Sequence, residues 1–183
     1  MGPGHIKHAG AQPTLEIGEI NELGGAPSAR VTALYQAFQS TKGTAITIPP
    51  DIRVAVWSKF LFIASWSGVG AATRVPIGIV RGMPETRQLL VSAMQEIAEV
   101  AHGHGIRLPQ DVVATTMAYI DSLPPQGTPS MQRDIAEGKP SELESLCGAV
   151  TRLGAKAGVP APTHTLLYHV LLPLESQVRG LIH

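Results

Sequence analysis

The stretch DIRVAVWSKFLFIASWSGVGAATR, residues 51–74, decides how the rest of the chain must fold. Asp51 can cap a helix, and the residues after it are apolar on nearly every side. An α-helix without a polar face is stable only when other elements surround it. The stretch therefore predicts a buried central helix, broken near Pro76 and Gly78. Lys59 is the one charged side chain between Arg53 and Arg74.

The residues after this helix carry the start and stop signals of further helices. Apolar residues recur at helical spacing there, and prolines, glycines and capping residues separate the segments. The first predicted helix starts at Pro84 and runs to 103, the second covers about 109–121, and Thr128 and Pro129 open a short third one. Ser141 and Glu144 form a predicted capping box that starts the next helix, which ends at Gly158. Thr163 caps the last predicted helix, which has a kink near Pro173.

Residues 1–50 have a different pattern. Short β-branched segments at 5–10, 14–19 and 44–49 predict strands, and the spacing of apolar residues within 28–41 predicts one helix. The change of pattern falls between Pro49 and Asp51. The sequence thus predicts a mainly α protein, in which a helical domain over 51–183 follows a small α/β segment over 1–50.

Composition excludes several classes of protein. The 183 residues have a formal net charge of zero, which argues against nucleic acid as a partner. Cys147 is the only cysteine, so neither a disulfide framework nor a cysteine metal site is expected. The N-terminus lacks the apolar core of a signal peptide, and the run 60–66 is too short to span a bilayer. We expect a cytoplasmic protein without a membrane partner.

The chain is poor in charge, and its polar groups concentrate in one run. Charged residues make up 15% of the sequence, yet residues 128–146 hold a dense set of them around the turn EGKP. A chain so short of surface charge is expected to associate with itself, which predicts a homo-oligomer. The polar run has two readings, a solvated surface loop or one wall of a binding site.

Lys59 also has two readings. A lysine on an apolar helix can extend its ammonium to the surface, or it can line a cleft as a proton donor. The second role requires a carboxylate nearby, because burial disfavours the charged ammonium. Glu142 can supply it, since Glu144 is taken up by the predicted capping box. The hydroxyl of Ser130 would complete a set suited to an anionic hydroxy acid or keto acid.

Three motifs carry a family resemblance. DIRVAVWSKFLF, VPIGIVR and PSMQRDIAEGKPSELESLCGAVTRLGAKAGVPAPTHTLLYHVL resemble, in order and spacing, the C-terminal domain of the ketopantoate reductase (2-dehydropantoate 2-reductase) family. The segment GPGHIKHAG…LEIGE resembles the strands that close the nucleotide-binding domain of that family. The resemblance implies a helical domain like that of 6-phosphogluconate dehydrogenase, preceded by a remnant of a Rossmann domain.

The resemblance also implies roles for named residues. Lys59 matches the catalytic lysine, which contacts the C2 oxygen of the substrate and acts as general acid. Glu142 matches the carboxylate that binds the substrate hydroxyl, and Ser130 matches a residue that contacts the substrate carboxylate. The implied reaction is NADPH-dependent reduction of 2-dehydropantoate in pantothenate biosynthesis, and the three residues are expected to share one cleft.

Two departures from the family pattern stand out. The family places asparagines four and eight residues after the lysine, where this chain has Ile63 and Ser67. Ser67 is a candidate substrate-binding residue, but Ile63 cannot hydrogen-bond. Three alternatives therefore stay open for the substrate: 2-dehydropantoate, another 2-keto acid, or none. The glycine fingerprint of a nucleotide-binding strand–turn–helix is absent, because the glycines of SGVGAAT lie in a predicted helix. This chain by itself is therefore expected not to bind NADPH.

The remaining candidates are interpreted as structural. His102 and His104, like His164 and His169, lack the spacing of metal ligands. Cys147 lies on the apolar side of its predicted helix, which favours a core role over a nucleophile. Two functions from different classes stay open: the catalytic part of a reductase, inactive alone, or a helical oligomerisation module derived from the same family.

Overall fold

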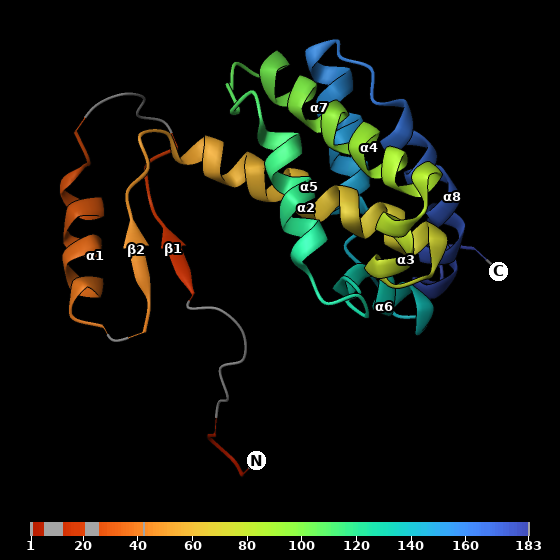
Figure 1. Ribbon diagram of the computed structural model, residues 1–183, viewed down its shortest axis with the longest axis horizontal. Helices are drawn as coiled ribbons and strands as arrows, with labels where there is room; N and C mark the ends of the chain where they lie inside the picture. Colours follow the sequence, from red (N-terminus) through yellow and green to blue (C-terminus); the bar gives the residue numbers. More distant parts are fainter. Residues whose placement is uncertain (1, 6–12, 21–25, 42, 183) are drawn as a thin grey trace. The chain divides into compact units, whose positions relative to one another are not determined.

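The computed structural model describes residues 2–5, 13–20, 26–41 and 43–182. They form two compact units, residues 1–55 and residues 56–183. Figure 1 shows short strands and one helix in the first unit and helices in the second. The prediction of a mainly helical protein is thus confirmed.

The first unit contains a strand–helix–strand element. β1 (Thr14–Glu16) and β2 (Ala45–Thr47) pair in parallel, and α1 (Ala29–Gln39) lies between them in the sequence. Parallel strands need such a crossover, because a tight turn can only join antiparallel ones. The predicted elements at 14–19, 28–41 and 44–49 are present; the strand predicted at 5–10 falls almost wholly outside the described residues.

The second unit is built from helices that follow one another with short connections. They are α2 (Ile52–Thr73), which begins in the first unit, then α3 (Ile77–Gly82), α4 (Pro84–Gly103), α5 (Val112–Ser122), α6 (Ser130–Ala136), the π-helical turn η1 (Glu144–Gly148), α7 (Ala149–Ala157) and α8 (Pro162–Val178). Pro84 occupies the first turn of α4 as predicted, whereas the short helix α3 was not predicted.

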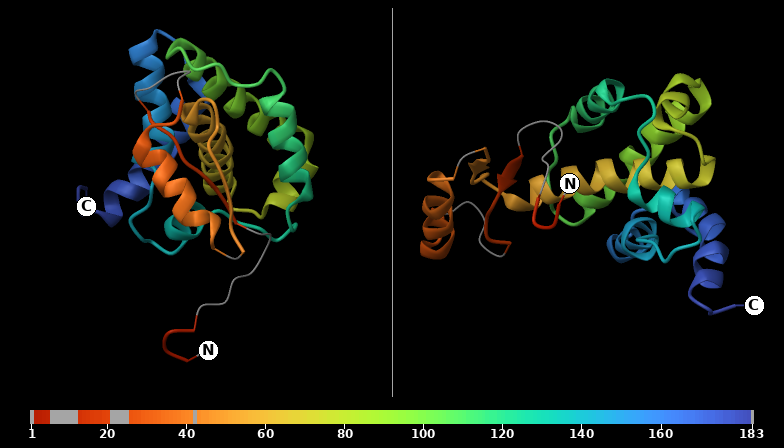
Figure 2. Two further views of the ribbon diagram at one scale, coloured as in Figure 1. Left: turned by 90° about the vertical axis from the view of Figure 1, so that its left-hand side faces the viewer. Right: turned by 90° about the horizontal axis from the view of Figure 1, so that it is seen from below.

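α2 lies in the middle of the second unit. Figure 2 (left) looks along α2 and shows the other helices of this unit around it. The contacts agree: Phe62 packs edge-on against Tyr119 of α5, Gly68 faces Cys147 of η1 and Leu167 of α8, and Gly70 faces Gln132 of α6. These contacts confirm the central position predicted for this helix.

The prediction that α2 is buried on all sides is wrong for its first half. Leu61, Ala64 and Val69 are fully buried, but Val56 is 55% exposed and Phe60 is only half-buried. By length and composition α2 could also cross a membrane. The core helix of a soluble protein can have the same length and composition.

Two predicted helix caps are replaced by long-range contacts. Ser141 does not form a capping box with Glu144; its backbone N–H donates instead to the carboxylate of Glu175. Thr163 does not cap α8 with its side chain; its backbone N–H donates to Glu96. A local sequence pattern cannot reveal either acceptor, since each lies more than thirty residues away. Gly158 does end α7, at a φ of +69°.

The close approach of α2 to its neighbours yields a first prediction. A Cβ at Gly68 would lie 2.9 Å from the Cys147 Sγ and 3.0 Å from the Leu167 Cδ1. Gly68→Val should therefore lower the free energy of unfolding by about 1–3 kcal/mol, as overpacking a core does. Chemical denaturation measures it. Gly82→Ala is the control, because nothing lies within 4 Å of its Cβ position; equal losses in both variants would contradict the packing.

Candidate functional site

Lys59, Ile63 and Ser67 form a stripe along α2. A spacing of four residues keeps them on one side of the helix. The side chains of the stripe become more buried toward the C-terminus of α2: Lys59 is exposed, Ile63 is half-buried and Ser67 is 2% exposed. The ammonium of Lys59 is thus open to solvent, and Ser67 lies in the part of α2 that other helices surround.

Ser130 is the first residue of α6. The next residue, Met131, is fully buried, and Gln132 donates its side-chain N–H to the backbone oxygen of Val75 at 3.2 Å. A Cβ at Gly70 would lie 2.7 Å from the Gln132 Oε1. The start of α6 is thus held against the C-terminal half of α2, with the side chain of Ser130 exposed.

Glu142 precedes η1 and is exposed. The residue after it, Leu143, is fully buried, and the residue before it, Ser141, is bonded to Glu175 of α8. Two residues further on, Glu144 accepts hydrogen bonds from Arg152 and, at 2.6 Å, from the hydroxyl of Tyr168. The carboxylate of Glu144 is thus engaged by Arg152 and Tyr168. The hydrogen bond to this carboxylate raises the pKa of the Tyr168 hydroxyl.

Both segments that carry the predicted site residues therefore pack on α2. Gly70 contacts α6, which begins at Ser130, and Gly68 contacts Cys147, which lies five residues after Glu142. Within the described part of the chain, no hydrogen bond or ion pair joins Lys59, Ser67, Ser130 or Glu142 to another of the four. The shared cleft that the sequence predicts for them stays a prediction.

A buried acid–base pair was not predicted from the sequence. Glu96 of α4 is 8% exposed, and its carboxylate accepts the backbone N–H groups of Thr163 at 2.6 Å and His164 at 3.0 Å. It also lies 3.0 Å from the Nδ1 of His164, which is fully buried. The pair joins α4 to the start of α8. A glutamate within an otherwise apolar helical stripe is the signal that could have pointed to it.

Opposing influences act on the pKa of Glu96. Burial is the largest of them and raises it, but the hydrogen bonds from His164 and Thr163 together lower it below the ordinary value. The carboxylate therefore stays ionised at neutral pH and holds the first turn of α8, where negative charge is favoured.

Cys147 and His104 have structural surroundings. Cys147 is fully buried between α2 and α8, and burial raises the pKa of its thiol to about 12, so it is not a nucleophile at neutral pH. The Nε2 of His104 lies 3.0 Å from the backbone oxygen of Leu153, and its ring lies beside that of Trp57. No group of three or more potential metal-binding side chains occurs among the described residues.

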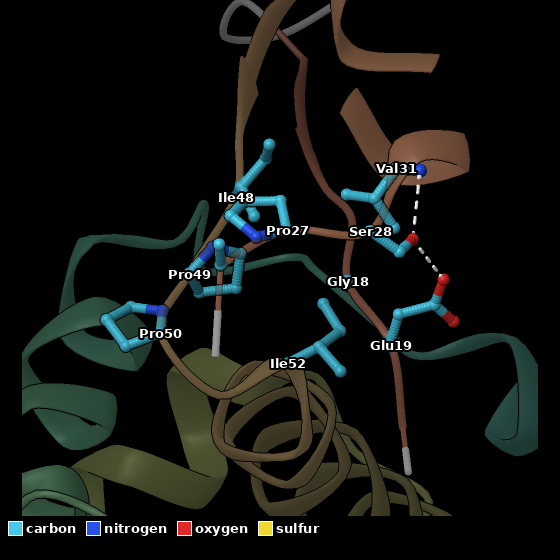
Figure 3. Close-up of a pocket in the computed structure, with 10 residues that line it drawn as sticks. Gly18, Glu19, Pro27, Ser28, Val31, Ile48, Pro49, Pro50 and Ile52 are labelled. Atoms are coloured by element: carbon cyan, nitrogen blue, oxygen red, sulfur yellow. Dashed lines mark hydrogen bonds between the residues drawn. The ribbon is translucent and has the colours of Figure 1, made fainter. Parts of the chain in front are cut away.

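The first unit holds a small pocket of about 180 Å³ (Figure 3). Ser28 and Glu19 lie on its rim, where the Ser28 hydroxyl donates to the Glu19 carboxylate at 2.6 Å and accepts from the N–H of Val31 at 3.3 Å. Hydrogen bonds from Arg30, and from Ser28 to a lesser degree, lower the pKa of Glu19 to about 2.

This pocket does not suit the pyrophosphate of a dinucleotide. Such a group is held at a helix N-terminus that follows a glycine-rich loop. Here the N-terminus of α1 already faces the ionised Glu19, which would repel a phosphate. The glycines of SGVGAAT lie inside α2 and face Cys147 and Gln132, so they are packing positions. Neither this pocket nor the segment SGVGAAT therefore offers a cradle for a dinucleotide.

Comparison with known proteins identifies the family. Residues 51–175 match the family model described as Ketopantoate reductase PanE/ApbA C terminal. The chain belongs to the ketopantoate reductase family. This is a family of NAD(P)-dependent oxidoreductases, and the chain corresponds to its C-terminal domain with a short preceding segment.

Curated relatives match most of the chain. A 2-dehydropantoate 2-reductase of Halobacterium salinarum is 30% identical over 160 residues, which is 87% of this chain and 51% of that protein. An uncharacterized oxidoreductase of Bacillus subtilis is 26% identical over 95% of this chain and 56% of its own length. The chain spans about half the length of the curated relatives it matches.

Solved structures show the same fold. A PanE/ApbA family ketopantoate reductase from Ralstonia eutropha superimposes with a TM-score of 0.81 at 26% identity, covering 97% of this chain and 56% of that one. D-mandelate dehydrogenase, solved with NADH and anilino(oxo)acetate, gives a TM-score of 0.73 at 20% identity, covering 82% of this chain and 50% of that one. The latter likeness concerns the fold alone.

The Glu96 contacts yield a second prediction. Glu96→Gln should lower the free energy of unfolding by about 1–3 kcal/mol at pH 7, because the buried N–H groups of Thr163 and His164 lose a charged acceptor. The carboxylate has a lowered pKa in the folded state, so its contribution disappears as the pH falls through that value. Urea denaturation at pH 7 and at acidic pH measures this. The prediction would be contradicted if the two proteins differed in free energy of unfolding by the same amount at acidic pH as at pH 7.

Proposed function

We propose that the chain is the substrate-binding and catalytic half of an NADPH-dependent cytoplasmic reductase of the pantothenate route that acts on 2-dehydropantoate or a related 2-keto acid. The observation that supports this most directly is the match of residues 51–175 to the C-terminal family model. The stripe of Lys59, Ile63 and Ser67 on α2 agrees with it, because it begins at an exposed ammonium.

Lys59 is the proposed general acid. Reduction of a ketone adds a hydride to the carbonyl carbon and a proton to the oxygen. An ammonium that hydrogen-bonds the oxygen polarises the carbonyl and then supplies the proton. Ser130 would hydrogen-bond the substrate carboxylate, and Glu142 would bind the substrate hydroxyl. The hydride belongs to a nicotinamide cofactor, for which neither the pocket of the first unit nor SGVGAAT offers a cradle, and a nucleotide-binding domain would hold it.

Ile63 and Ser67 bear on which keto acid is bound. An isoleucine next to the ammonium removes a hydrogen-bonding group from this side of the helix, whereas Ser67 offers only a short hydroxyl. Sites that lack a hydrogen-bond partner for a polar substrate group bind that substrate less selectively. The proposed substrate is therefore a 2-keto acid whose chain beyond C2 is less polar than that of 2-dehydropantoate, or 2-dehydropantoate bound weakly.

A second candidate is a non-enzymatic oligomerisation module derived from the same family. The exposed apolar residues favour it: Val56 is 55% exposed on α2, and Leu166 and Val170 are 61% and 55% exposed on α8. Such apolar surface, on a chain with 15% charged residues, is typical of a protein that associates. Association is compatible with the reductase as well, and a Staphylococcus aureus relative of the same fold is described as a dimeric ketopantoate reductase.

An activity assay separates the two candidates and forms the third prediction. The 183-residue chain alone should not oxidise NADPH with 2-dehydropantoate, and joining it to a complete nucleotide-binding domain should produce turnover. Lys59→Ala should then lower kcat by about 100-fold or more, the range for loss of a general acid. Arg74→Ala, a loss of charge at the far end of α2, is the control. Turnover unaffected by Lys59→Ala would contradict the proposal, and no turnover with any 2-keto acid would favour the module.

A fourth prediction concerns selectivity. In the joined protein, Ile63→Asn should raise kcat/KM for 2-dehydropantoate by about tenfold or more, because the new amide can pair with a polar substrate group. Ile63→Leu conserves volume without adding a donor and serves as the control. Steady-state kinetics with 2-dehydropantoate and an unbranched 2-keto acid measure the effect; an equal gain for both substrates would contradict the role of Ile63.

A fifth prediction concerns association. Sedimentation velocity of the chain at micromolar concentrations should show a dimer or larger species, because the exposed apolar side chains of α2 and α8 gain from burial. A single monomeric species at high micromolar concentration would contradict it.

A further inference from the structure

Ser141 is held by α8 at every one of its polar groups. Its backbone N–H donates to both oxygens of the Glu175 carboxylate at 3.1 Å, and its hydroxyl donates to the Oε2 at 2.6 Å. Its backbone oxygen accepts from the Arg179 Nη2 at 3.1 Å. Glu175 and Arg179 thus clamp a single residue of the polar run from a helix more than thirty residues further along the chain.

The carboxylate of the clamp is buried, whereas the Arg179 side chain is 45% exposed. Glu175 is 5% exposed, and Arg179 donates its Nε to the same carboxylate at 2.5 Å. Burial raises the pKa of Glu175, but the hydrogen bonds from Ser141 and Arg179 together lower it below its ordinary value. A buried carboxylate with charged and hydrogen-bonded partners is a rigid anchor, because any rotation would leave several polar groups unpaired.

The same residue is tied to the chain beyond Glu142. The hydroxyl of Ser141 accepts the backbone N–H of Leu143 at 3.2 Å, and the Leu143 side chain is fully buried. The backbone oxygen of Glu142 accepts the N–H of Leu146 at 2.9 Å. Glu142 thus lies between two immobilised neighbours, and its own side chain points to solvent without a partner among the described residues.

We propose that Glu175 is a positioning residue: through Ser141 it fixes the backbone from which the Glu142 carboxylate reaches the substrate. The inference rests on the proposed function of Glu142. Groups that bind a reacting substrate must be held to within a fraction of an ångström, and they depend on neighbours that lock their own conformation. The exposed turn EGKP just before Glu142 makes no contact among the described residues that would fix the Glu142 backbone by itself.

The local sequence does not explain why residue 175 is a glutamate. If the position were exposed, most polar residues would fit there. Its burial against Ser141 supplies the reason. Glu96 makes a comparable contact, accepting two backbone N–H groups at the start of α8, but it holds a segment that carries none of the proposed site residues. Glu96→Gln is therefore the matched control for Glu175→Gln, because both variants remove a buried carboxylate that binds backbone N–H groups.

The test uses the chain joined to a complete nucleotide-binding domain, with Glu175→Gln, Ser141→Ala and Ser141→Thr as variants and Glu96→Gln as the control. Glu175→Gln and Ser141→Ala should raise KM for the 2-keto acid and lower kcat/KM by about tenfold or more, the scale of a small misplacement of a site group. Ser141→Thr retains the hydroxyl and should keep kcat/KM within about twofold of the unsubstituted protein, because its donor and acceptor remain.

A purely structural role predicts a different pattern. Glu96→Gln should lower the free energy of unfolding and leave kcat and KM unchanged. If Glu175→Gln behaves in the same way, with KM unchanged, the positioning role is overturned. If Glu175→Gln does not fold, the contrast between Ser141→Ala and Ser141→Thr decides, and equal kinetics for those two would overturn it.

Amide hydrogen exchange of the same proteins separates this inference from the proposed function. Glu175→Gln should speed exchange at Ser141 and Leu143, whereas Glu96→Gln should speed it at Thr163 and His164. Unchanged exchange at Ser141 in Glu175→Gln would overturn the clamp. No turnover in the unsubstituted joined protein, together with the expected exchange, would overturn the proposed function and with it the catalytic purpose of the clamp.

Discussion

The close approach of α2 to its neighbours at Gly68 and Gly70 is the constraint on which the helical unit depends. Without a side chain at these positions, η1 and α8 come within van der Waals distance of one side of α2, and α6 of another. The segments that contain Ser130 and Glu142 are continuous with α6 and η1. The distance of both segments from α2, and hence from the helix that carries Lys59, is set by these two glycines.

Buried carboxylates serve a second structural purpose in this fold. Glu96 and Glu175 each accept backbone N–H groups of a segment distant in the sequence, and each has a pKa below its ordinary value. In both cases the carboxylate takes over a role that a local capping residue would usually fill. One consequence is that the start of α8 is tied to α4 and the polar run is tied to the end of α8, so the second unit is closed by long-range contacts.

The residues of the candidate site were predicted from the sequence, and their shared cleft stays a prediction, but the contacts that hold their segments could not be predicted. Lys59 stood out as a lone charge on an apolar helix, and Ser130 and Glu142 lay in a dense polar run with a family motif. Glu175 lay in the last predicted helix, and His164 was interpreted as structural without a named partner. A hydrogen bond across more than thirty residues leaves no periodic signal, so the partner of neither residue could be named before the fold was known.

The sequence by itself determined that this is a mainly helical member of the ketopantoate reductase family, built around residues 52–73, because the apolar period and the family motifs are local properties of the chain. It also determined that SGVGAAT is helical and not a nucleotide loop. Only the tertiary structure decided which acceptors satisfy Ser141 and Thr163, and that the first half of α2 is partly exposed. Burial and long-range hydrogen bonding depend on which segments meet in space, and that is a property of the whole fold.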